Sequence, residues 1–148
     1  RAIDLSRQGM RGGHGGPFGC VIVQGDTIVG EGFNQVTSTN DPTAHAEVQA
    51  IRDACRRLGM FQLTECVVYT SCEPCPMCLA ALFWARPLGV FMANSAKDAA
   101  NIGFDDAFIY AQLRLPIAKR EMRMDRVAGP EALEVFKEWL NKTDKRKY

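Results

Sequence analysis

Two stretches of this sequence determine the fold that we expect: TAHAEVQAIRDAC at residues 43–55 and SCEPCPMCLAAL at residues 71–82. The first places His45, one of two histidines in the chain, two residues before Glu47. The second contains three of the six cysteines: Cys72, Cys75 and Cys78. Imidazole nitrogen and thiolate sulfur form a donor set that suits zinc. We therefore expect the two stretches to meet at one metal ion.

Both stretches are expected to begin a helix. Asp41 can cap the first helix and Pro42 can occupy its first position, while Gly59 ends it. Pro74 or Pro76 opens the second helix. An apolar stripe at helical spacing is expected to face the core from the first helix: Ala44, Val48, Ile51 and Cys55.

The spacing of His45 and Glu47 restricts where the ion can lie. Each helical residue turns by about 100°, so positions i and i+2 point about 200° apart. One ion beside the helix could not contact both side chains, whereas an ion beyond its N-terminal end could. The free N–H groups and the dipole at a helix N-terminus also favour thiolate over thiol. We therefore infer that two helix N-termini face the same ion.

The number of ligands separates a catalytic ion from a structural one. His45, Cys75 and Cys78 make three ligands, whereas structural zinc takes four protein ligands and catalytic zinc keeps a position for water. Glu47 would then stand beside that water and carry its proton. The pattern H-x-E followed by P-C-x-x-C is typical of zinc-dependent nucleobase deaminases.

The cysteines also permit other interpretations. Cys72 and Cys75 have the same Cys-x-x-Cys spacing and form an alternative pair. An iron–sulfur cluster of the bacterial ferredoxin type needs a fourth cysteine where Leu82 stands, so we set it aside. Disulfides are not needed in a chain of this size and hydrophobicity. The remaining cysteines lie in apolar runs and are expected in the core: Cys20, Cys55 and Cys66.

The rest of the pattern predicts a single α/β domain over residues 1–148. Apolar residues alternate on both sides of a Gln-Gly-Asp turn within residues 18–34, which indicates a β-hairpin. Further strands are expected at 66–70, 88–94 and 120–127, and helices at 2–10, 103–113 and 129–143. Because strands and helices alternate after the hairpin, we expect a mixed central sheet in a three-layer α/β/α arrangement.

Composition limits the possible partners and location. The chain has 18 Lys and Arg against 17 Asp and Glu, a net charge of +1. This balance argues against a protein that holds nucleic acid on a broad basic face. No apolar run approaches the roughly 18 residues of a membrane span, and no secretory signal pattern is visible. We therefore expect a cytoplasmic protein with a small-molecule substrate and no membrane partner.

Four segments together resemble the bacterial guanine deaminases of the cytidine deaminase-like superfamily. They are GGPFGCVIV at 15–23, GFNQVTSTNDPTAHAEVQAIRDAC at 32–55, YTSCEPCPMCLAALFWARP at 69–87 and AANIGFDDAFIY at 99–110. The zinc motif is shared across the superfamily, whereas GFDD and the terminal Tyr148 point to the guanine branch. The resemblance implies a cytidine deaminase-like fold that binds Zn²⁺. It also implies hydrolysis of guanine to xanthine and ammonia, in which zinc-bound hydroxide attacks the amino-bearing carbon and Glu47 shuttles the proton.

The resemblance also implies roles for residues outside the metal motif. Asp106 would hold the purine and relay a proton to the departing amine, although it could instead cap the next helix, the role we expect of Asp105. Asn34 would present its amide to the acceptor edge of the ring, unless it is only a turn residue. Phe18 would stack on the purine and Trp84 would line the pocket, although both could equally be core residues.

The final segment is implied to act in a homodimer. In the family the last helix and tail, about residues 130–148 here, cross to a partner subunit in a domain swap, and Tyr148 closes the partner's pocket. A disordered, solubilising tail is the alternative, because the last residues are DKRKY.

Other functions remain open at this stage. A tRNA adenosine deaminase, or a cytosine or nucleoside deaminase, would share the metal motif. A zinc-stabilised binding module without catalysis would need a fourth protein ligand, for which Cys72 is the nearest source. Aminotriazines carry the same amino group between ring nitrogens, so turnover of them is a reasonable side activity.

Overall fold

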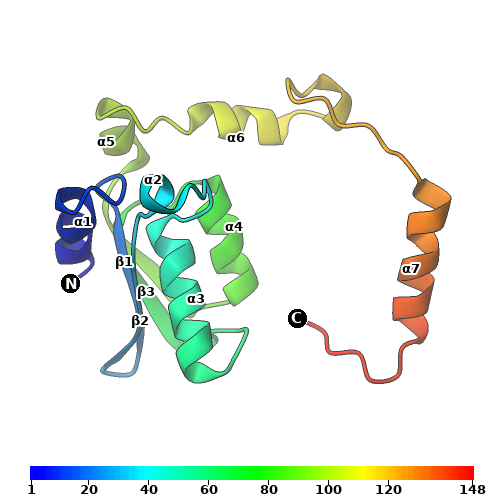
Figure 1. The fold of residues 1–148 in the computed structure, drawn as a ribbon, viewed down its shortest axis with the longest axis horizontal. Helices are drawn as coiled ribbons and strands as arrows, with labels where there is room; N and C mark the ends of the chain where they lie inside the picture. The colour runs from blue at the N-terminus through cyan, green and yellow to red at the C-terminus, as the bar shows by residue number, and fades with distance from the viewer. The chain divides into compact units, whose positions relative to one another are not determined.

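A four-stranded sheet forms the centre of the N-terminal part of the protein (Figure 1). The computed structural model describes residues 1–148, which divide into one unit over 1–106 and a second over 107–148. The strands are β1 (Gly19–Gln24), β2 (Thr27–Phe33), β3 (Cys66–Cys72) and β4 (Gly89–Asn94). Their spatial order is β2-β1-β3-β4. β1 is antiparallel to both β2 and β3, while β3 and β4 are parallel, so the mixed sheet is confirmed.

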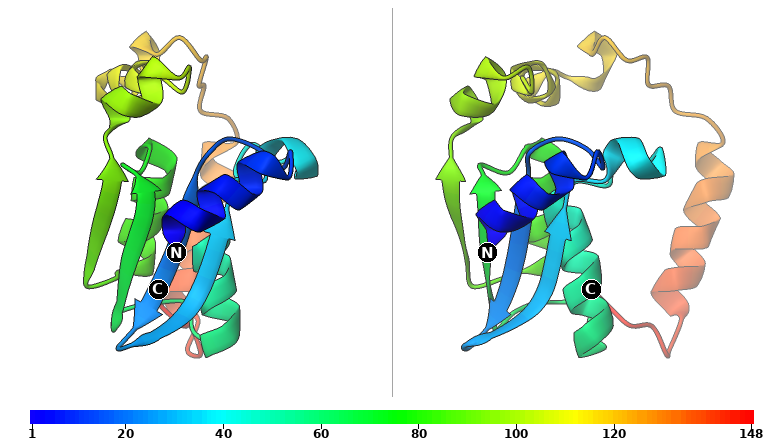
Figure 2. Two further views of the ribbon diagram at one scale, coloured as in Figure 1. Left: turned by 90° about the vertical axis from the view of Figure 1, so that its left-hand side faces the viewer. Right: turned by 60° about the vertical axis from the view of Figure 1, so that its left-hand side comes forward.

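Helices cover both faces of this sheet. The helix α1 (Ala2–Arg11) crosses one face, and α3 (Ala46–Leu58) and α4 (Pro76–Ala85) lie on the other (Figure 2). Two short helices complete the unit: α2 (Val36–Thr39) and α5 (Ala96–Asn101). The three-layer α/β/α fold predicted from the sequence is therefore confirmed for residues 1–106.

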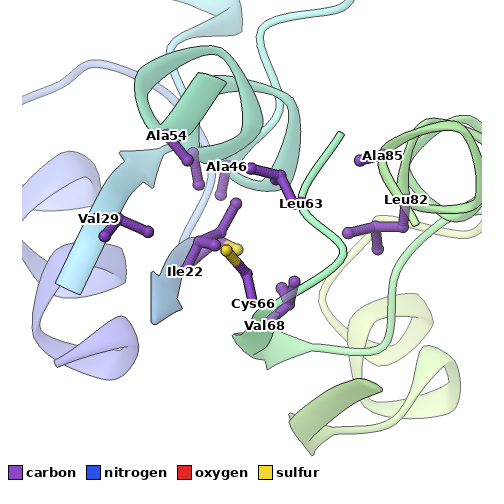
Figure 3. Packing of buried hydrophobic residues seen from close by; sticks show 11 residues of the cluster. Ile22, Val29, Ala46, Ala54, Leu63, Cys66, Val68, Leu82 and Ala85 are labelled. Atoms are coloured by element: carbon purple, nitrogen blue, oxygen red, sulfur yellow. The ribbon is translucent and has the colours of Figure 1, made fainter. Parts of the chain in front are cut away.

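The buried core lies between the sheet and the pair α3 and α4 (Figure 3). Ile22, Leu63 and Val68 are fully buried, and Cys20 and Cys66 pack among them as expected. A smaller cluster of Ala2, Leu5 and Val21 fills the space under α1. The core thus follows the alternation of the strands, with one face of β1 packed on each helical layer.

The face by which α3 contacts the sheet differs from the predicted stripe. Its most buried apolar positions are three alanines one turn apart: Ala46, Ala50 and Ala54. A Cβ added at Gly32 of β2 would stand 2.3 Å from the Ala46 carbonyl oxygen, and one at Gly30 would stand 2.6 Å from that of Ala50. The helix therefore rests almost backbone to backbone on the sheet, and Ile51 and Cys55 lie only at the border of the core.

Local sequence signals account for several element ends. The hairpin turns at Gly25, with φ of 57°, and α3 ends at Gly59, with φ of 65°, both in the left-handed region that suits glycine. Pro76 is the first residue of α4, which confirms one of the two predicted starts, Pro74 or Pro76. Glu73 accepts a hydrogen bond from the Ala96 N–H at 2.9 Å and so joins the β3–α4 loop to α5.

Two predicted elements are wrong. Asp41 and Pro42 do not begin α3; the Asp41 carboxylate instead accepts hydrogen bonds from the Thr43 N–H at 2.8 Å and its hydroxyl at 2.7 Å, which forms a local turn. The predicted strand at 120–127 is absent, and those residues form no regular strand or α-helix. Charged residues interrupt both faces of this segment, so that only Met122 and Met124 share an apolar side.

Residues 107–148 contain α6 (Ala107–Arg114), the 3-10 turn η1 (Ile117–Lys119) and α7 (Gly129–Asn141). Neither helix buries a side chain. The apolar residues of α7 are exposed: Leu133, Val135, Phe136, Trp139 and Leu140. No helix of the protein is both long and apolar enough to cross a membrane.

The close approach of α3 predicts a sharp difference between two glycines. Gly32→Ala is expected to lower the free energy of unfolding by about 1–3 kcal/mol, because its Cβ would collide with backbone. Gly89→Ala, where a Cβ meets nothing within 4 Å, is the matched control and should be neutral or slightly stabilising. Urea denaturation measures both. Equal stability of the two variants would contradict this packing.

Candidate active site

The structure brings His45, Cys75 and Cys78 together at the starts of two helices. His45 is the N-cap residue of α3 and Cys75 the N-cap residue of α4, while Cys78 lies in the first turn of α4. His45 Nδ1 stands 3.6 Å from Cys75 Sγ and 3.5 Å from Cys78 Sγ. All three donor atoms lie within 4.8 Å of one another. The inference that two helix N-termini face one point is confirmed.

These distances fit tetrahedral zinc. With Zn–S near 2.3 Å and Zn–N near 2.0–2.1 Å, a tetrahedral ion holds nitrogen and sulfur about 3.5–3.6 Å apart. The observed nitrogen–sulfur separations match that spacing. No other group of three or more His, Cys, Asp or Glu residues is arranged to hold an ion. The set provides three protein ligands, the number typical of a catalytic site.

The two sulfurs compete for protons. A hydrogen bond from Cys78, followed by one from His45, lowers the pKa of Cys75 to about 4. The same contact with Cys75, together with burial, raises the pKa of Cys78. The hydrogen bond with Cys75 also raises the pKa of His45. Cys75 is thus the sulfur that ionises more readily, and both sulfurs must be thiolates to bind a metal.

Glu47 lies beside the three donors but is held by the sheet. Its side chain is buried, and burial raises its pKa. The Thr70 hydroxyl, on β3, donates a hydrogen bond to Glu47 Oε1 at 3.1 Å. Interaction with the Cys78 side chain partly offsets this rise in the pKa of Glu47. A buried carboxyl group between the sheet and the sulfurs is suited to moving protons near the ion.

Cys72 does not join the group of donors. Its thiol donates instead to the Ser95 carbonyl oxygen at 3.5 Å, at the junction of β4 and α5. The alternative Cys72–Cys75 pair is therefore not formed, and Cys72 does not supply a fourth ligand. All six cysteines are free, so the disulfide interpretation also fails.

Asn34 is fixed by the loop before β1. Its Oδ1 accepts hydrogen bonds from the Gly16 N–H at 3.3 Å and the Val36 N–H at 3.2 Å. A Cβ at Gly15 would stand 2.1 Å from that oxygen, so only glycine leaves room for it. With its oxygen engaged in this way, the Asn34 amide offers its NH₂ group as the donor for a ligand.

Phe18 and Asp106 are connected to the same loop. The Phe18 ring meets Phe104 edge to face, with centroids 4.9 Å apart. Phe104 precedes Asp105 and Asp106, so this contact ties the GFDD turn to residues 16–18. Burial raises the pKa of Asp106, and the charge of Cys75 adds to that shift. α6 begins directly after Asp106, so the capping interpretation also stays open.

Two predicted site residues are exposed. Trp84 lies near the end of α4 and is 62% exposed. Tyr148 belongs to the second unit and is 72% exposed. Their roles in the pocket stay predictions.

Sequence reasoning missed two contacts around the site. Thr70 is a polar residue at an inward position of β3, two residues after the fully buried Val68, and that alternation was the available signal. Gly15 lies in a glycine-rich loop whose fold could not be read from the sequence, so its contact with Asn34 had no signal at all.

Comparison with known proteins places this geometry in a family. Residues 1–94 match the family model described as the cytidine and deoxycytidylate deaminase zinc-binding region. The chain belongs to this family. Its donor set and its family together identify the metal as zinc.

The relatives include guanine deaminases. The Bacillus subtilis (strain 168) guanine deaminase is 52% identical over all of this chain and 95% of its own length. The crystal structure of guanine deaminase from that organism superposes with a TM-score of 0.97 and covers 100% of this chain and 94% of that chain. A Nitrosomonas europaea guanine deaminase structure, 29% identical, gives a TM-score of 0.67 over 71% of this chain and 61% of that chain. The predicted resemblance is confirmed.

A tRNA-specific adenosine deaminase of Aquifex aeolicus (strain VF5) is also related. It is 36% identical over 85% of this chain and 81% of its own length. Proteins with this fold therefore act on more than one substrate, and the substrate depends on the residues of the site and not on the fold.

Zinc content distinguishes the proposed ligands from Cys72. We expect about one zinc per chain in the wild type and almost none in Cys75→Ser, because a hydroxyl is a poor substitute for thiolate. Cys72→Ser should keep its zinc, since Cys72 only donates to a carbonyl oxygen. Elemental analysis after gel filtration in chelator-free buffer makes the comparison. A zinc-free Cys72→Ser protein would refute this ligand set.

Proposed function

We propose that this protein is a zinc-dependent guanine deaminase, which hydrolyses guanine to xanthine and ammonia. The main support is the three-donor centre with buried Glu47 beside it, in a chain 52% identical over its full length to a guanine deaminase. A centre with three protein donors leaves a position for reaction, which a purely structural zinc site does not need. A binding module without catalysis is therefore disfavoured.

His45, Cys75 and Cys78 would hold the ion. When bound, zinc lowers the pKa of water and so provides a hydroxide nucleophile at neutral pH. Glu47 would take one proton from the attacking water and give it to a ring nitrogen. It would then take the second proton from the hydroxyl of the adduct and pass it toward the amino group, which leaves as ammonia when the C–N bond breaks. Its burial supports this role, because burial raises the pKa of Glu47 and so makes the carboxyl group a better proton acceptor. Proton transfer of this kind typically contributes 10²- to 10⁴-fold to a rate.

Asn34 and Phe18 would orient the purine. Guanine has acceptor atoms along one edge, and the NH₂ group of Asn34 can donate to them, because its oxygen is already bound by two backbone N–H groups. The Phe18 ring offers an apolar face on which a base can stack. Because Gly15 has no side chain, it leaves room for the Asn34 amide in this position.

Asp106 would hold the donor side of guanine. The ring presents N–H and NH₂ groups side by side, and a carboxylate can accept from both. Its raised pKa also suits a group that relays a proton to the departing amino group. Turnover of an aminotriazine, with the same amino-substituted ring carbon, would follow from this arrangement.

The last residues would act on a second copy of the chain. The exposed apolar side of α7 and the exposed residues Trp84, Val90 and Met92 of the first unit support an interface between subunits. We propose a domain-swapped homodimer in which residues of about 130–148 cross to the partner and Tyr148 covers its pocket. The free thiols support a reducing, cytoplasmic location.

One substrate panel tests the activity. Zinc-loaded protein is incubated with guanine, adenine, cytosine, cytidine, an aminotriazine and tRNA, and ammonia release is measured. We expect the fastest release from guanine, and at least a 10²-fold loss in Glu47→Gln at unchanged zinc content. Release from tRNA or cytidine but not from guanine would refute the proposal.

A mixing experiment tests the swap. Glu47→Gln lacks its proton carrier, and Tyr148→Ala lacks the proposed cover. If the tail crosses, a mixed dimer has one complete site, with Glu47 from one chain and Tyr148 from the other. Co-expression should therefore restore activity beyond that of either variant alone, in a particle of twice the 16.4 kDa chain mass. A mixed dimer without such recovery would contradict the swap.

A further inference from the structure

We infer that Thr70 is a positioning residue, which holds one oxygen of Glu47 so that the other faces the reacting atoms. This inference rests on the role of Glu47 proposed above. It starts from a single contact: the Thr70 hydroxyl donates to Glu47 Oε1 at 3.1 Å. A carboxylate only accepts, so the hydroxyl proton lies on this bond whenever Glu47 is ionised.

The contact is isolated from water. Thr70 is 4% exposed and Glu47 is 6% exposed. Thr70 stands on β3 between Cys20 of β1 and Met92 of β4, so the sheet fixes its backbone on both sides. Glu47 lies in the first turn of α3, whose backbone rests closely on the same sheet. The donor and the acceptor are thus each held by a rigid element, which gives the carboxyl group a defined direction.

The hydroxyl is not required to form the strand. Val67 and Val68 precede Thr70 on β3, and valine has the same branched shape and a high preference for strands. A valine at position 70 would satisfy the fold and leave Oε1 without its donor. Threonine at this inward position is therefore explained by the carboxylate that it contacts.

The orientation matters because Glu47 must take a proton from the water and deliver it to the substrate. A glutamate has three rotatable side-chain bonds, and a proton carrier has to reach its partner within about 2.6–3.2 Å. With Oε1 held by the Thr70 hydroxyl, rotation of the carboxyl group is restricted and its other oxygen takes a defined direction. Loss of the Thr70 hydroxyl releases this constraint and lowers the fraction of molecules with Glu47 correctly placed.

Three variants separate positioning from a structural effect. Thr70→Val removes the hydroxyl, Thr70→Ser retains it, and Ser71→Ala removes the neighbouring buried hydroxyl that accepts the Gly19 N–H at 2.9 Å. We expect Thr70→Val to lower kcat about tenfold or more with little change in KM or zinc content, within the range that proton transfer supplies. Thr70→Ser should recover most of that loss. Ser71→Ala should lower the melting temperature and leave kcat near the wild-type value.

The results distinguish this inference from the proposed function. Wild-type kcat at full zinc content in Thr70→Val overturns the role of Thr70 even if guanine is the substrate. An equal loss in Thr70→Ser overturns it too. If the wild type does not deaminate guanine, the proposed function fails, and crystal structures of the zinc-loaded wild type and Thr70→Val then decide. A Glu47 carboxyl group in the same place in both would overturn the inference, and a rotated one would support it.

Discussion

The site depends on two helices that begin at the same point in space. His45 and Cys75 occupy equivalent N-cap positions of α3 and α4, and the imidazole and the two sulfurs meet only because both helices start there. A shift of either helix by one residue would carry a donor about 100° around its axis and out of reach. The fold therefore has to fix the start of each helix more strictly than its end.

The packing of α3 explains how its start is fixed. Glycines on β2 and alanines on α3 bring backbone against backbone, which leaves the helix little room to shift along the sheet. α4 is fixed differently, by Pro76 at its start and by Glu73, which joins the preceding loop to α5. Rigid elements thus carry the donors, and the charged chemistry takes place where both helix dipoles favour thiolate.

The sequence was sufficient for the metal donors and for most of the architecture, because these depend on spacing. His-x-Glu and Cys-x-x-Cys at helix starts restrict the geometry strongly, and alternation identifies the hairpin and β3. The Asp41-Pro42 pair led to a wrong prediction of where α3 begins, because helix caps and local turns use the same residue types. The strand expected at 120–127 had little apolar alternation to support it. The α3 stripe was misjudged because burial there depends on close approach and not on hydrophobicity.

Contacts between distant residues carried no local signal. The contact of Gly15 with Asn34 joins two loops, and that of Thr70 with Glu47 joins a strand to a helix. Each contact orients a functional group, the Asn34 amide or the Glu47 carboxyl group, that was already predicted from the sequence. Motif and spacing thus predict which chemical groups are present, whereas the direction in which each group points depends on packing that only the fold defines.

The central claim is that one imidazole and two sulfurs hold zinc and leave one position to solvent. X-ray absorption spectroscopy at the zinc edge of the ligand-free, zinc-loaded protein tests this most directly. The account predicts about two sulfur neighbours near 2.3 Å and about two nitrogen or oxygen neighbours near 2.0–2.1 Å. A third sulfur in the coordination shell would contradict it, because another cysteine would then fill the position needed for water.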